Sequence, residues 1–145
     1  MSEKERSRKG EAFSIRLSAA TDRYVEAEAA RRKRSKSAIV EALTEEAART
    51  HRFPGIGFKG EDYDRRAWVV GSHLDVWQLI ELLHGYGEDE ERLQADFDQL
   101  TTHHLRVARA YAQAYPDEIE EALAENALSA EDVRALFPLV EIADA

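Results

Sequence analysis

A six-residue alternation near the N-terminus constrains the fold more than any other feature of the chain. In residues 13–18, with the sequence FSIRLS, the apolar Phe13, Ile15 and Leu17 alternate with polar residues. Alternation with a period of two is typical of a β-strand that has one apolar face. A lone short strand leaves its backbone groups and its apolar face without partners. We therefore expect this strand to pair with the same strand of a second copy, which makes the protein a homodimer.

Two helices are predicted directly after this strand. Ser18 is placed to cap a helix over residues 19–32. The main core side chains expected from this helix are Tyr24, Val25 and Ala29. A second helix is predicted over residues 35–51. Its apolar stripe comprises Ile39, Val40, Leu43 and Ala47. The alternative for residues 13–18 is an edge strand of an ordinary sheet.

The segments FSIRLS, ATDRYVEAEAARRKR and SKSAIVEAL together resemble the ribbon-helix-helix family of transcription factors and antitoxins. In that family two strands pair antiparallel and enter the DNA major groove, while the start of the second helix holds a backbone phosphate. The resemblance implies base contacts from Ser14 and Arg16, and phosphate contacts from Ser35, Lys36 and Ser37. It implies a dimer core of Phe13, Ile15, Leu17, Ile39 and Leu43. A β-ribbon fits the major groove, and a helix N-terminus offers unpaired amides to an anion.

The first predicted helix ends in a basic run, Arg31 to Arg34. We expect a solvated helix end there, because cations suit the C-terminal dipole of a helix, with a distant phosphate contact as the alternative. Lys33 stands where the family usually has a glycine between the helices. Glu28 and Arg32 stand where larger apolar residues are common.

Charge is divided unevenly along the chain, whose formal net charge is −9. Residues 1–52 hold thirteen Lys or Arg and nine Asp or Glu, a balance of +4, and residues 53–145 hold seven and twenty, a balance of −13. An acidic protein that binds DNA must gather its positive charge on one face. The basic part, residues 1–52, contains the predicted strand, so we expect the positive face there. Residues 1–11 are expected to form a mobile basic arm, either solvated or in contact with phosphate.

Proline and two glycines in residues 53–57 mark the start of a second domain. A hairpin is predicted with strands at residues 56–59 and 67–70, followed by helices at residues 76–85, 89–96, 102–115 and 116–126. The motifs PGIGF, RRAWVVG, LDVWQLIELL and AYPDEIEEALAEN resemble a family of homeodomain-like helical domains of unknown function found in VapB-type antitoxins. The expected fold class is mainly α: a ribbon-helix-helix domain over residues 12–52 and a small helical bundle with a β-hairpin over residues 53–126.

The helices predicted at residues 89–96 and 102–115 have the spacing of a helix-turn-helix. They are therefore a second candidate for reading DNA. The later helix begins Thr-Thr-His-His and lies among acidic residues, with Arg106 and Arg109 as its basic side chains. These charges favour packing or partner binding instead.

Catalytic and membrane functions are not expected. The chain has no cysteine, no glycine-rich phosphate loop and no HExxH motif. His103 and His104 are adjacent, so they point about 100° apart on a helix and cannot share one metal ion. We therefore predict no enzyme activity, no metal and no cofactor. Because there is neither a long apolar run nor a signal-peptide pattern in residues 1–10, we expect a cytoplasmic protein without membrane attachment.

The last segment, residues 127–145, contains a dense apolar cluster at Leu136, Phe137, Leu139, Val140 and Ile142. Such a cluster must be covered by the chain's own bundle or by another molecule. The antitoxin resemblance implies that it binds a toxin protein, with a small PIN-type ribonuclease as the candidate. The expected function is a DNA-binding antitoxin of a type II toxin-antitoxin pair, which represses its own operon and neutralises the toxin. The alternative is a free-standing dimeric repressor whose second domain binds a ligand or extends the dimer.

Overall fold

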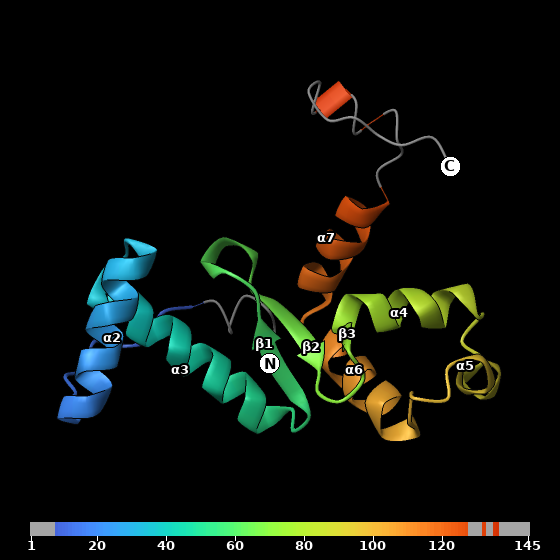
Figure 1. Cartoon of the computed structure of the whole chain (residues 1–145), viewed down its shortest axis with the longest axis horizontal. Helices are drawn as coiled ribbons and strands as arrows, with labels where there is room; N and C mark the ends of the chain where they lie inside the picture. Colours follow the sequence, from blue (N-terminus) through green and yellow to red (C-terminus); the bar gives the residue numbers. More distant parts are fainter. Residues whose placement is uncertain (1–7, 128–131, 133–134, 137–145) are drawn as a thin grey trace. The chain divides into compact units, whose positions relative to one another are not determined.

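The computed structural model describes residues 8–127, 132 and 135–136. Within these residues the chain forms six α-helices, one 3-10 turn and a small antiparallel sheet with the strand order β1-β2-β3 (Figure 1). The expectation of a mainly helical chain with a hairpin is confirmed. Contacts along the chain divide it into two compact units, residues 1–73 and 74–145. The hairpin therefore groups with the N-terminal helices, whereas its sequence pattern suggests the start of the second domain.

Helix α2 (Ala19–Arg32) begins where predicted, because the Ser18 hydroxyl accepts a hydrogen bond from the Thr21 amide at 3.3 Å. It packs against α3 (Lys36–Arg52), and Val25 and Ile39 are the buried side chains of the two helices, at 2% and 0% exposure. Tyr24 was expected in this core but is 55% exposed. Neighbouring residues of a helix point about 100° apart, so a helix that buries Val25 turns Tyr24 toward solvent.

The turn between α2 and α3 is built around Lys33, which adopts the left-handed conformation at φ 53° and ψ 45°. Its amide donates to the Ala30 carbonyl at 3.4 Å, and the Arg34 amide donates to the Ala29 carbonyl at 3.0 Å. These two bonds satisfy carbonyls at the end of α2, in the arrangement that usually has glycine at the left-handed position. Lys33 therefore performs the structural task that a glycine has in most such turns.

The hairpin pairs β1 (Ile56–Lys59) with β2 (Arg66–Val69), close to the predicted strands. Ile56 lies opposite Val69, and both are 1% exposed. The connecting loop contains the 3-10 turn η1 (Asp62–Asp64), and the two-residue strand β3 (Leu74–Asp75) completes the sheet. Neither was predicted, because segments of two or three residues are too short to show a period.

Gly60 fixes the path of the hairpin loop. Its φ is +101°, and a Cβ atom there would lie 2.1 Å from the Asp64 carbonyl oxygen. Both the conformation and the close approach require glycine.

The second unit holds four helices at nearly the predicted positions: α4 (Val76–Gly85), α5 (Glu90–Asp96), α6 (Thr102–Ala114) and α7 (Pro116–Asn126). Their shared core is apolar, and α4 packs against α6 and α7. The largest fully buried side chain of this core is Tyr111, whose hydroxyl donates to the Glu118 carboxylate at 3.1 Å and so links α6 to α7. Across the described ranges, every helix is too short or too polar to cross a bilayer.

Candidate nucleic-acid interface

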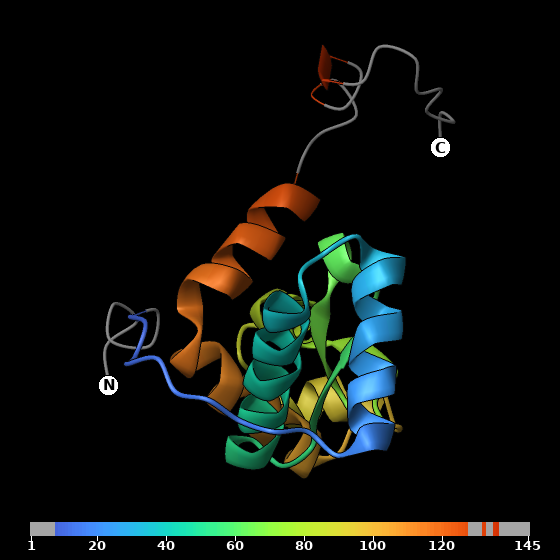
Figure 2. The same ribbon diagram turned by 90° about the vertical axis from the view of Figure 1, so that its left-hand side faces the viewer.

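Residues 11–18 have no regular secondary structure, so the strand predicted at residues 13–18 is not formed within one copy. Figure 2 shows this segment as an extended trace that leads into the start of α2. A strand requires a hydrogen-bonded neighbour, and the described part of the same chain provides none for these residues. The expected pairing of this strand with a second copy therefore stays a prediction.

The residues proposed for the dimer core fall into two groups. Phe13 is 81% exposed and Ile15 is 55% exposed, while Leu17 is partly buried. Ile39 is completely buried within one copy and Leu43 is partly buried in α3. Of these residues, Phe13 and Ile15 therefore expose apolar surface, and Ile39 belongs to the core of the single unit.

The side chains proposed to contact bases are exposed. Ser14 and Arg16 alternate with Phe13 and Ile15, so an extended backbone places them on the opposite face. The Arg16 guanidinium makes no hydrogen bond or ion pair with any residue that the structure describes. It is therefore available to an external acceptor such as a guanine edge.

The residues proposed to hold phosphate lie together at the start of α3. The Ser35 hydroxyl caps the helix by accepting from the Ala38 amide at 3.1 Å, and Ser37 is exposed in the first turn. An uncovered helix start of this kind attracts anions through its amides and dipole.

Lys36 has partners that the sequence did not reveal. Its ammonium group forms an ion pair with Asp22, and the Glu26 carboxylate lies 3.7 Å away. The hydrogen bond with Asp22 is the main reason that the pKa of Lys36 is raised. Both carboxylates belong to α2, four residues apart and hence on one side of that helix. The sequence shows this spacing, but only the packing of α2 against α3 shows that the two carboxylates face Lys36.

The basic run at the end of α2 is a structural network and not merely a solvated helix end. Arg31 donates to Glu28 at 2.9 Å, and Arg32 donates to the same carboxylate at 2.8 Å. The hydrogen bond from Arg31 is the largest cause that lowers the pKa of Glu28 to about 2. The Arg32 side chain is only 10% exposed, so it is poorly placed for a DNA phosphate.

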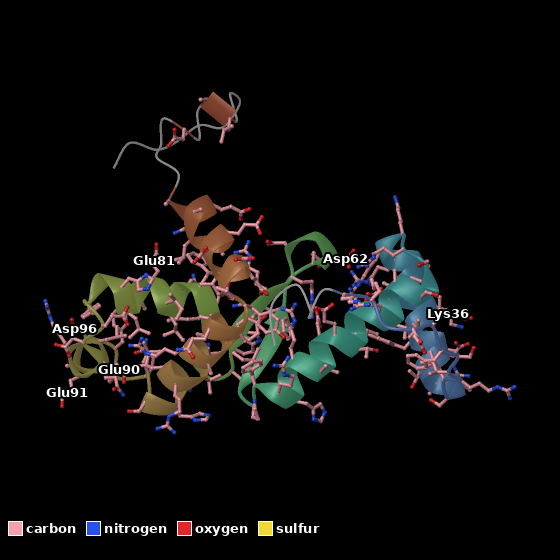
Figure 3. All side chains as sticks on the ribbon, turned by 180° about the vertical axis from the view of Figure 1, so that it is seen from behind. Lys36, Asp62, Glu81, Glu90, Glu91 and Asp96 are labelled. Atoms are coloured by element: carbon pink, nitrogen blue, oxygen red, sulfur yellow. The ribbon has the colours of Figure 1, made fainter. Side chains whose placement is uncertain are left out.

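The same network reaches the hairpin loop through Asp62 (Figure 3). Arg34 donates to this carboxylate at 2.7 Å and Arg32 at 3.2 Å, while Arg31 reaches Glu61 at 3.2 Å. The hydrogen bond from Arg34 is the main reason that the pKa of Asp62 is lowered. The network therefore anchors the η1 turn to the end of α2.

The basic arm is described only from residue 8 onward. Within that part, the Lys9 ammonium group forms an ion pair with Glu41 on α3. A second cation that was a candidate for phosphate binding is thus also paired with a carboxylate of its own chain.

The helix pair α5–α6 gives little support to a second DNA-reading site. Arg109 donates to Glu88 at 2.6 Å and to Glu90 at 3.0 Å, so its guanidinium is paired with carboxylates of its own unit. His104 accepts from the Thr101 amide through Nδ1 at 3.2 Å and so completes the cap of α6. Among the described residues, no three His, Asp or Glu side chains are grouped as metal ligands.

The proposed toxin-binding cluster lies largely outside the described residues. Leu136 is described and is 61% exposed. The other four residues, Phe137, Leu139, Val140 and Ile142, are not among the described residues. Toxin binding by this cluster therefore stays a prediction.

Comparisons with protein-family models, with curated proteins and with solved structures found no match to this chain. The ribbon-helix-helix and antitoxin assignments accordingly stay predictions that rest on the motifs of the sequence.

Proposed function

We propose that the protein is a dimeric DNA-binding antitoxin that represses its own operon and neutralises a toxin protein. Residues 13–18 of two copies pair as a two-stranded ribbon in the major groove, and the start of α3 in each copy holds a backbone phosphate. One observation carries the DNA-binding part of this proposal. Phe13 and Ile15 are exposed on a segment that has no strand partner within the described chain and that directly precedes the helix pair α2–α3.

The physical argument begins with the exposed apolar face. Burying a phenylalanine or isoleucine side chain is worth about 1.5–3 kcal/mol, so pairing two copies through Phe13 and Ile15 is favourable. The pairing also gives the backbone groups of the segment their hydrogen-bond partners. Once this face is covered, Ser14 and Arg16 project from the other face of the ribbon, where a major groove offers hydrogen-bonding base edges.

Arg16 provides the sharpest test of DNA reading. We expect Arg16→Ala to weaken binding to the promoter of the chain's own operon by about ten- to hundredfold, with a much smaller effect on a scrambled duplex. Arg52→Ala is the matched control, because Arg52 is also exposed but lies about 24 Å from Lys36 at the other end of α3. Titration of labelled duplexes at fixed salt measures both variants. An equal loss on both duplexes would refute base reading by Arg16.

The toxin-neutralising part rests on the antitoxin resemblance and on the exposure of Leu136. Co-purification with the product of the adjacent gene tests it. Leu136→Asp should abolish co-purification and leave promoter binding intact, whereas Val70→Asp, which alters another exposed apolar side chain, should change neither. A chain that binds its promoter but retains no neighbouring gene product would favour the free-standing repressor.

A further inference from the structure

We propose that Asp22 and Glu26 act as an internal substitute for DNA phosphate at Lys36 and thereby limit the affinity of the protein for DNA. The inference rests on the proposed phosphate contact at the start of α3. It adds two affinity-determining residues, on α2, to which the resemblance assigns no role.

The geometry of the pair carries the proposal. Lys36 lies in the first turn of α3, yet its ammonium group is paired directly with Asp22 and has Glu26 at 3.7 Å. All three side chains are at least one-third exposed, so the pair lies at the surface, where a DNA phosphate could reach it. The oxygens of a carboxylate and of a phosphate both accept charge-assisted hydrogen bonds from an ammonium group. A DNA phosphate and Asp22 therefore compete for the same partner.

The competition changes the electrostatics of binding. A lysine that is unpaired in the free protein releases about one condensed counterion from DNA when it meets a phosphate. Lys36 must first give up Asp22, whose carboxylate is then left to attract a cation from solution. The two ion exchanges oppose each other, so Lys36 contributes little to the salt dependence of binding. Lys9, which is paired with Glu41, repeats the same arrangement in the basic arm.

Replacement of the carboxylate by an amide tests the proposal. Asp22→Asn should bind both the promoter duplex and a scrambled duplex about three- to tenfold more tightly at 0.1 M salt, since phosphate contacts carry no sequence information. The slope of log affinity against log salt concentration should steepen by about 0.9. In the Asp22→Asn/Lys36→Ala double variant the gain should disappear, because the freed cation is absent.

Glu45→Gln is the control for net charge. Glu45 pairs with Arg49 at 2.7 Å within α3, so this variant also removes one carboxylate from an ion pair in the same unit. It should leave affinity and slope nearly unchanged. An equal gain from Glu45→Gln, a gain that survives Lys36→Ala, or no gain in Asp22→Asn would overturn the proposal.

Failure of this inference is distinguishable from failure of the proposed function. If the wild-type chain and Asp22→Asn both fail to bind any duplex at low salt, DNA binding and the inference are overturned together. If the wild-type chain binds its promoter and Asp22→Asn binds equally well, only the role of Asp22 is overturned. Exchange of the Lys36 ammonium protons, followed by NMR without DNA, should be faster in Asp22→Asn and checks that the ion pair has been removed.

Discussion

Replacement of Ile15 by alanine should weaken the proposed dimer by about a hundredfold. The change removes three carbons, worth about 2.4 kcal/mol when they move from full exposure to full burial. Ile15 is 55% exposed in one copy, so only that fraction, about 1.3 kcal/mol, is gained on pairing. A symmetric dimer contains the residue twice, which gives about 2.6 kcal/mol and hence nearly two powers of ten in the dissociation constant.

Sedimentation equilibrium over a range of protein concentrations measures this dissociation constant directly. Ser14→Ala is the control, because Ser14 adjoins Ile15 but belongs to the opposite face of the predicted strand. Its dimer should be as tight as that of the wild-type chain. The reasoning is refuted if Ile15→Ala dissociates at the same concentration as Ser14→Ala, or if the wild-type chain is a monomer throughout.

Two further predictions concern the stability of the N-terminal unit. Lys33→Gly should raise the free energy of unfolding by about 1 kcal/mol, because a Cβ atom is unfavourable at φ 53°, whereas Lys33→Ala should leave it unchanged. Urea titrations measure the three free energies, and equal values for Lys33→Gly and the wild-type chain would contradict this reasoning. The pKa of Glu28 is about 2 in the folded protein against an ordinary 4.5, so its stabilising effect is complete above about pH 4.5 and is lost as the pH falls toward 2. Thermal melts should therefore show a difference between the wild-type chain and Glu28→Gln that narrows over this interval, and a constant difference would contradict the assignment.

The limits of the helices were predictable because each is marked by a local signal. Ser18 caps α2, Asp75 caps α4 with help from Gln78, and Pro116 begins α7. A cap or a first-turn proline acts within one turn, so it can be recognised in the sequence without knowledge of the tertiary structure. The hairpin was predictable for a similar reason, because two short apolar segments flank the polar loop of residues 60–66, which begins at Gly60.

Features that depend on packing between helices were not predictable. From the sequence alone, Tyr24 and Val25 are equally plausible core residues, and only the orientation of α2 on α3 decides that Val25 is buried. The candidate site was likewise predictable only where it does not depend on packing. The exposure of Arg16 follows from its place in the alternation, but the ion pair between Lys36 and Asp22 joins two helices and depends on how they cross. The strand predicted at residues 13–18 would need a hydrogen-bonded neighbour from a second copy, so it stays a prediction.

The network that ties Arg32 and Arg34 to Asp62 has a consequence for the order of folding. These pairs join residues 30 and 28 positions apart in the chain, whereas the α2–α3 turn is local. Closing a long loop is entropically unfavourable, so the network should form after the two helices have met, on the native side of the folding barrier. Stopped-flow measurements on Asp62→Asn should then show faster unfolding and an almost unchanged folding rate. The network would thus govern how long the N-terminal unit stays folded and have little influence on how quickly it folds.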